Sequence, residues 1–245
     1  MELRKLFALL FLFLFCAAVG KSWHLARGGF RFDRCVSDPA FIFLGQEPSL
    51  EQSQALSQPF RYLAAGRQSY VFESADGKYV LKLPRTDIYR AAPWREAGDR
   101  QFRKASVSKS IELSLGLLHA ETKLQAIAWP HPVTLIDRLG RQRSWSRSVW
   151  LLQPKTLTLS QQIERALRAG DSASARHAVQ SFAALLSRIQ KKGVVCKDLS
   201  FTSNIGYDGK EAFFIDTGAF RPKEAWPHPM TSHIRLWLQA ADSQL

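Results

Sequence analysis

Two aspartates in the second half of the chain constrain its fold more than any other feature. Asp198 and Asp216 lie 18 residues apart, and between them stand Asn204 and a short hairpin with Asp208-Gly209 at its turn. A helix with one apolar face precedes them, and Asp171 is placed to cap its N-terminus. A long helix followed by a short hairpin, after a strand-rich first half, is typical of an α+β arrangement.

The rest of the sequence divides into a strand-rich first region and a helical second region. Residues 58–83 alternate like strands around a turn at Asp76-Gly77, and residues 105–128 carry a helical period. Strands are predicted at 133–136 and 148–152, joined by an arginine-rich loop; helices at 158–170, 171–192 and 233–240; and the hairpin at 205–215. We therefore predict an α+β fold with a small antiparallel sheet lobe, residues 58–153, and a short helical lobe, residues 154–245.

The N-terminus reads as a targeting or anchoring segment. An apolar run from Leu6 to Val19 follows two basic residues, and its 14 residues span about 21 Å as a helix. This is shorter than the roughly 20 residues that cross a bilayer, so a cleaved signal peptide with Ala18-Val19-Gly20 as its cleavage site is one prediction. The other is an uncleaved single-pass anchor that extends to Leu25 while Lys21 reaches toward the membrane surface.

The basic residues around this segment predict its orientation. More of them follow the apolar run than precede it, which places the following domain in the cytoplasm of a protein anchored in a bacterial inner membrane. With a cleaved signal the domain would instead be exported. Residues 1–25 are thus predicted as signal anchor or signal peptide, and residues 26–57, rich in Gly, Pro, Ser and Gln, as a linker.

Charge and cysteine content narrow the partner classes. The formal net charge is +13, which favours an anionic partner such as a phosphate, an acidic membrane surface or a nucleic acid. The sequence has no signature of the common nucleic-acid-binding modules, so we do not expect a nucleic-acid partner. Its three cysteines lie far apart and form neither zinc spacing nor a disulfide framework.

Four separated pieces carry the candidate chemistry. They are a turn between two strands with Gly66, Ser69 and Val71; Lys82 inside the next strand; Lys197-Asp198-Leu199 with Asn204 six residues after the aspartate; and Asp216-Thr217-Gly218 at a strand end. Phosphoryl transfer from ATP needs groups of these kinds. Backbone amides and a lysine hold phosphate oxygens, one aspartate accepts the proton of the attacking hydroxyl, and an asparagine and a second aspartate hold Mg²⁺.

In this order the pieces resemble the protein-kinase-like superfamily, including its small-molecule and sugar kinases, over about residues 58–220. The resemblance implies a two-lobed fold with ATP in the cleft. It implies that Gly66, Ser69, Val71 and Lys82 contact ATP, that Asp198 is the catalytic aspartate, and that Asn204 and Asp216 hold Mg²⁺. The segment 58–82 is also similar to membrane-anchored kinase-like proteins of chlamydia-type bacteria.

The glutamate that pairs with the strand lysine in this superfamily has two candidates here. Glu121 lies 12 residues before the strand that begins at Val133, and this spacing favours it. Glu112 lies 21 residues before that strand and is the alternative. We predict that Glu121 pairs with Lys82 and belongs to the ATP site.

Departures from the family pattern leave two functions open. The phosphate loop keeps a single glycine, and Asn204 lies one residue further from Asp198 than the family spacing. Either the loop between them bulges by one residue or Asn204 does not reach the metal. Since only 27 residues follow Gly218, we expect a small-molecule, lipid or glycan hydroxyl as acceptor rather than a folded protein. The alternative is a catalytically inactive kinase-like scaffold at a membrane surface.

Overall fold

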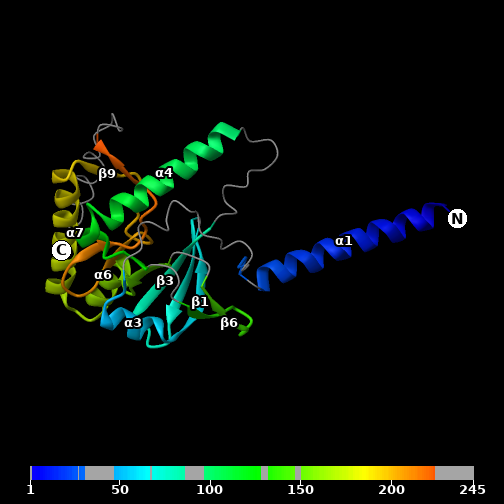
Figure 1. Cartoon of the computed structure of the whole chain (residues 1–245), viewed down its shortest axis with the longest axis horizontal. Helices are drawn as coiled ribbons and strands as arrows, with labels where there is room; N and C mark the ends of the chain where they lie inside the picture. Colours follow the sequence, from blue (N-terminus) through cyan, green and yellow to red (C-terminus); the bar gives the residue numbers. More distant parts are fainter. Residues whose placement is uncertain are drawn as a thin grey trace.

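The computed structural model describes residues 2–26, 28–30, 47–66, 68–85, 97–127, 132–146 and 150–223. In this part of the chain, a curved sheet forms one lobe, and two helices with short strands form the other (Figure 1). The mixed α+β character and the two lobes agree with the prediction from the sequence. The predicted helix at 233–240 lies outside the described residues.

The sheet lobe is built on seven strands in the order β4-β7-β3-β2-β1-β5-β6. Neighbouring strands are antiparallel except β1 and β5, which run parallel. The strands are β1 Pro59–Ala65, β2 Ser69–Ser74, β3 Tyr79–Pro84, β4 Gln125–Ile127, β5 Val133–Ile136, β6 Gln142–Trp145 and β7 Trp150–Pro154. β6 forms inside the segment predicted as an arginine-rich loop. The turn predicted between β2 and β3 is present, with Gly77 at a φ of +70°.

Part of the region predicted as a linker belongs to the core of the sheet lobe. Phe30 is 1% exposed and packs edge-on against Tyr70 and Phe72, with ring centroids 5.0 and 5.1 Å apart. The hydroxyl of Tyr70 donates to the carbonyl of Gly29 at 3.1 Å and so fixes the backbone beside this ring. The chain is therefore attached to the sheet lobe well before residue 58.

A short helix in the same region also packs on the sheet lobe. α3 spans Leu50–Leu56, and Ser49 caps it in a capping box with Gln52. Leu56 is buried in the cluster that contains Phe30. The sequence did not suggest this helix because its polar residues gave no clear period.

The helix predicted at 105–128 is divided. α4 spans Ala97–Leu115, a turn follows, α5 spans His119–Thr122, and the chain then enters β4. Lys123 ends α5 with a φ of +50°, a left-handed conformation that stops the helix. Leu124 and Ile111 pack in one apolar cluster across this break, so the apolar spacing that suggested one helix is satisfied by tertiary packing instead.

In its described residues, 154–223, the helical lobe has two helices and two small sheets. α6 spans Leu159–Arg168 and begins at a capping box on Thr158, and α7 spans Ser172–Lys191 and is capped by Asp171 as predicted. One sheet joins β11 Ala212–Phe214, β10 Ile205–Tyr207 and β8 Leu157–Thr158, and the other joins β12 Phe220–Pro222 and β9 Val194–Cys196. α7 buries its apolar face against these strands, and the hairpin turn at Asp208-Gly209 is confirmed.

The first helix, α1, spans Glu2–Ala26 and extends away from the two lobes (Figure 1). Its apolar side chains are largely exposed, with Phe11 at 72% and Phe13 at 70%. In the described residues, no helix combines the length and apolarity that crossing a membrane requires. The predicted membrane span is therefore not supported.

Candidate functional site

A pocket of about 360 Å³ lies where the sheet lobe meets the hairpin of the helical lobe. Most of the predicted site residues line it: Gly66, Ser69, Val71, Lys82, Asn204 and Asp216. Apolar side chains, among them Val80, Ile111 and Leu151, form other parts of its wall. Apolar walls with a few convergent polar groups are typical of a small-ligand site.

Lys82 extends from β3 into this pocket. Its ammonium donates a hydrogen bond to the backbone carbonyl of Ile215. Loss of water around the ammonium lowers the pKa of Lys82 to about 8, and the negative charge of Asp216 opposes this shift. The pocket thus holds a cation that burial destabilises, and an anionic ligand would stabilise it.

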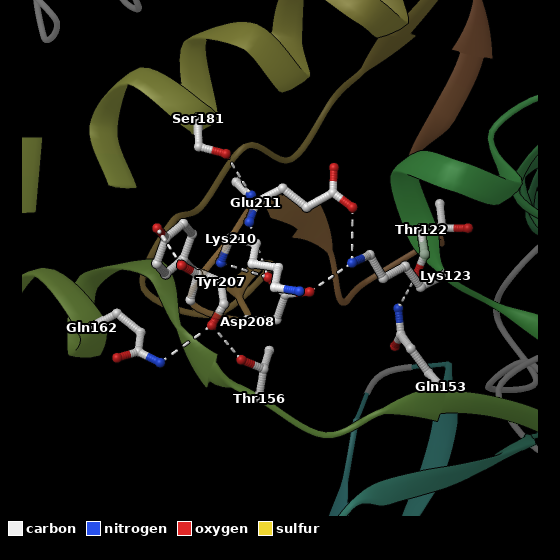
Figure 2. A network of polar contacts seen from close by, with 12 residues as sticks. Thr122, Lys123, Gln153, Thr156, Gln162, Ser181, Tyr207, Asp208, Lys210 and Glu211 are labelled. Carbon is white, nitrogen blue, oxygen red and sulfur yellow. Dashed lines mark hydrogen bonds and ion pairs between the residues drawn. The ribbon is translucent and has the colours of Figure 1, made fainter. Parts of the chain in front are cut away.

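The segment that joins the lobes is fixed by a buried amide. Gln153, in β7, is fully buried, and its Nε2 donates to the carbonyls of Thr122 at 2.5 Å and Phe214 at 2.7 Å. Figure 2 shows Gln153 directed toward Thr122. Because Phe214 ends β11 two residues before Asp216, this amide ties the sheet lobe to the strand that carries the aspartate.

A cluster of ion pairs beside Gln153 also connects the lobes. The ammonium of Lys123 lies between Asp208 and Glu211, at 2.7 and 2.9 Å from their carboxylate oxygens (Figure 2). Burial alone would raise the pKa of Asp208, but hydrogen bonds from Lys123 and from backbone N–H groups outweigh it and lower that pKa. This cluster holds the β10–β11 hairpin against the end of α5.

The loop between Asp198 and Asn204 takes up its additional residue in a tight turn. The backbone N–H of Asn204 donates to the carbonyl of Ser200 at 2.6 Å, and the side-chain Nδ2 of Asn204 donates to the carbonyl of Asp198 at 3.3 Å. These two hydrogen bonds hold Asn204 at the pocket wall. The carboxylate of Asp198 is exposed to solvent, and Asp198 is not part of the pocket wall.

Asp216 stands directly beside Asn204. The backbone N–H groups of Ile215 and Asp216 both donate to the carbonyl of Asn204, at 2.9 and 3.3 Å. The Oδ1 of Asp216 accepts a hydrogen bond from the N–H of Gly218 at 3.0 Å. The two residues predicted to hold a metal are thus joined through their own backbone.

The predicted phosphate loop is a tight turn held by an arginine. The N–H of Gly66 donates to the carbonyl of Ser69 at 2.8 Å, and a Cβ atom at position 66 would lie 3.3 Å from that oxygen. Arg85 donates to the carbonyl of Gly66 through Nη1 at 3.0 Å, and its backbone N–H donates to the carbonyl of Gln68 at 2.8 Å. Nothing in the sequence indicated this role of Arg85, because Arg85 stands after the end of β3.

Gln68 connects this loop to the turn after Asp216. Its Nε2 donates to the carbonyl of Gly218 at 3.3 Å. A Cβ atom on Gly218 would lie only 1.6 Å from Oε1 of Gln68, so the glycine leaves the space that this side chain occupies. The Asp216-Thr217-Gly218 pattern gave no indication of this contact, because Gln68 is 150 residues away in the sequence.

The predicted pairing of Glu121 with Lys82 is not found. Glu121 lies in α5 and is 2% exposed, and its carboxylate binds Lys192 at 2.7 Å and approaches Arg188 at 3.8 Å, both in or next to the end of α7. The alternative, Glu112, is exposed and pairs with Lys109 on its own helix. The chain turns after α4, and this turn directs Glu121 toward the helical lobe rather than toward β3.

The residues of the pocket fit a magnesium ion only together with a phosphate ligand. Within the described ranges, no group of three His, Cys, Asp or Glu side chains is arranged to hold a metal. Mg²⁺ is usually held by one or two protein side chains while phosphates and water complete its octahedron. The carboxylate of Asp216 and the amide oxygen of Asn204 would supply that protein share.

No family model matches the chain, and no curated protein sequence matches it either. Solved structures of WbdD match: one at a TM-score of 0.43 and 17% identity over 71% of this chain, and one titled a bifunctional kinase-methyltransferase at a TM-score of 0.40 and 17% identity. A structure of Rv3197 with erythromycin from Mycobacterium tuberculosis matches at a TM-score of 0.36 and 12% identity, over 84% of this chain and 57% of that one. The chain spans about a third of the WbdD structures, 35% and 34% of their length.

These matches agree with a divergent kinase-like fold. What assigns chemistry to the chain is the arrangement of its own residues: a strand lysine, a loop asparagine and a strand-end aspartate around one pocket.

Proposed function

We propose that the chain binds ATP with Mg²⁺ in the pocket and transfers a phosphoryl group to a hydroxyl of a small-molecule, lipid or glycan acceptor. One observation carries the proposal: the ammonium of Lys82, the amide of Asn204 and the carboxylate of Asp216 line the same pocket. A half-buried cation and two oxygen donors for a metal are the groups that a nucleoside triphosphate needs.

Each pocket group has a role in this proposal. Lys82 binds phosphate oxygens, and the backbone of the turn at Gly66 and Ser69 lies over them. Val71 and Leu151 contact the base from the apolar walls. Asn204 and Asp216 hold Mg²⁺, which neutralises charge on the phosphates when it is bound. Asp198 is exposed, its backbone carbonyl accepts a hydrogen bond from Asn204, and in this proposal its carboxylate orients the acceptor hydroxyl and takes up its proton.

The proposal keeps a membrane as the partner of α1 and the cytoplasm as the place of the two lobes. Support for the first is the exposure of large apolar side chains along α1, such as Phe7 at 63% and Phe15 at 57%. Exposed apolar surface of this extent favours contact with an apolar partner. Support for the second is the availability of ATP in the cytoplasm.

A second candidate function is a nucleotide-binding scaffold without phosphoryl transfer. The observation that favours it is the absence of a Lys82–glutamate pair in the described part of the chain, since both candidate glutamates bind other cations. Lys82 instead donates to a backbone carbonyl. Such a site can bind ATP without holding it in a geometry suited to transfer.

The substitution Asp198→Asn separates the two functions. We expect the full chain to bind Mg-ATP and to hydrolyse it slowly, with water as acceptor. Asp198→Asn should keep the ATP affinity and lose hydrolysis by about a hundredfold or more, since a positioned base contributes on that order. Asp171→Asn is a matched control because asparagine also caps α7. Binding without hydrolysis in the wild type would favour the scaffold, and no binding would exclude both.

A further inference from the structure

A buried serine on α4 holds the segment that follows Asp216. Ser110 is fully buried, and its hydroxyl donates to the carbonyl of Thr217 at 2.5 Å and accepts from the N–H of Phe220 at 2.8 Å. One hydroxyl thus satisfies two backbone groups in the residues directly after the aspartate. Buried backbone groups of this kind are costly to leave unpaired, so the contact fixes the path of the chain.

Two other serines on α4, Ser106 and Ser114, can be compared with Ser110. Ser106, one turn earlier, accepts a hydrogen bond from Nη2 of Arg221 at 2.6 Å, so it also holds β12. Ser114, one turn later, is equally buried, but its hydroxyl donates to the carbonyl of Ser110 within the helix at 2.8 Å. Ser110 and Ser114 are therefore the same residue type, on the same helix and equally buried, and differ in whether they touch the Asp216 segment.

Two other contacts fix the same segment from different sides. The carbonyl of Asn204 accepts hydrogen bonds from the N–H groups of Ile215 and Asp216 at its beginning. The carbonyl of Ala219 accepts from the N–H of Lys197 at 3.1 Å near its end. Ser110 contacts Thr217, between these points, and Phe220, directly after them. Within the same segment the carboxylate of Asp216 accepts a hydrogen bond from Gly218.

We propose that Ser110 is a positioning residue for Asp216, and that it connects α4 to the metal-holding side of the pocket. The inference rests on the proposed function of Asp216. The resemblance predicted that a Lys82–Glu121 pair connects a helix to the site. Here we assign that connection to the hydroxyl of Ser110 on α4. Loss of the hydroxyl frees the carbonyl of Thr217 and the N–H of Phe220, and the Asp216 carboxylate then moves relative to Asn204.

The test measures the metal and the nucleotide separately on the full chain. Mn²⁺ replaces Mg²⁺, and the decrease of its free electron paramagnetic resonance signal gives its affinity for the ADP-bound protein. ADP affinity without metal is measured by calorimetry in EDTA. Ser110→Ala should weaken Mn²⁺ binding about tenfold, as expected for two backbone groups left unpaired, and change metal-free ADP affinity by less than about twofold.

Ser114→Ala is the matched control, and it should leave both affinities within about twofold of the wild type. Ser110→Thr keeps the hydroxyl and should restore Mn²⁺ binding, a rescue that a purely structural role in packing does not predict. If Ser110→Ala does not fold, Ser110→Cys against Ser110→Thr makes the same comparison, because a thiol is a weaker donor. Equal Mn²⁺ affinities in the Ser110→Ala and Ser114→Ala proteins would overturn the inference. A wild type that binds neither ADP nor Mn²⁺ would remove the proposed function itself.

Discussion

The ammonium of Lys82 donates a hydrogen bond to the carbonyl of Ile215, the residue immediately before Asp216. This contact joins the sheet lobe to the helical lobe across the pocket. Among the described residues, no carboxylate is hydrogen-bonded to Lys82, and burial lowers the pKa of Lys82 to about 8. An anionic phosphate in the pocket would place a negative charge in hydrogen-bond contact with the Lys82 ammonium, which no described carboxylate does.

The lowered pKa of Lys82 predicts a pH dependence of ATP binding. The free site loses its ammonium as the pH rises through about 8, and a bound phosphate raises that pKa because it favours the charged form. ATP affinity should therefore be constant below pH 8 and fall above it, as measured by calorimetry. Lys82→Arg should bind without this fall, since a guanidinium keeps its charge. An affinity of the wild type that is unchanged up to about pH 9.5 would contradict this role of Lys82.

Glu121 is predicted to stabilise the fold and not to bind ATP. Its buried carboxylate binds Lys192 and lies near Arg188, so Glu121→Ala removes the carboxylate partner of Lys192 at the contact between α5 and α7, while Arg188 keeps its pairing with Glu211. We expect a loss of about 2 kcal/mol in the free energy of unfolding, measured by urea denaturation, with ATP affinity unchanged. Glu112→Ala should change neither quantity, because Glu112 pairs with Lys109 on the exposed surface of α4. If Glu121→Ala binds ATP more weakly but unfolds at the same free energy as the wild type, the predicted pairing of Glu121 with Lys82 would be supported instead.

Gln68 and Gly218 should behave as a coupled pair. Gly218→Ala puts a methyl group where Oε1 of Gln68 lies, and it should destabilise the chain by about 1 kcal/mol, since the flexible side chain can be displaced. In the Gln68→Ala background the same substitution should have almost no effect on the unfolding midpoint. A double-mutant cycle measures this coupling. Strictly additive effects would show that the two residues do not meet.

Phe30 is predicted to be part of the sheet lobe. Phe30→Ala removes a ring that is 1% exposed and packs against Tyr70 and Phe72, and it should lower the free energy of unfolding by about 3–5 kcal/mol. Phe15→Ala is a matched control on α1, where the ring is 57% exposed, and its effect should stay within about 0.5 kcal/mol. The comparison uses chemical denaturation of the full chain. If both variants unfold like the wild type, residues 28–30 are not part of the core.

Local patterns were sufficient to predict the centre of the site. Lys82 alternates with buried residues in β3, and Asp208-Gly209 favours the hairpin that brings Asn204 beside Asp216. Each of these patterns depends on residues close together in the sequence. Their order along the chain then predicted that strand, loop and hairpin would share one pocket.

What the sequence did not predict depends on contacts between distant residues. Phe30 is a single aromatic residue in a polar stretch, and nothing near it in the sequence indicates that it packs on β2. Glu121 has the spacing of the family, but its partners lie about 70 residues further along, on the other side of a turn that the helical period concealed. Three of the four serines of α4 recur every four residues, which is a visible signal. Serine on a helix is usually exposed, however, and the partners of Ser106 and Ser110 lie after Asp216.

The most direct test of the kinase-like site is calorimetry of ATP binding to the full chain with and without Mg²⁺. If Asp216 and Asn204 hold the metal together with the phosphates, Mg²⁺ should increase ATP affinity in the wild type by about tenfold or more. In Asp216→Asn the affinity with Mg²⁺ should equal the affinity without it, while metal-free binding stays as in the wild type. An ATP affinity that Mg²⁺ does not change in the wild type, or a magnesium effect that persists in Asp216→Asn, would contradict the account.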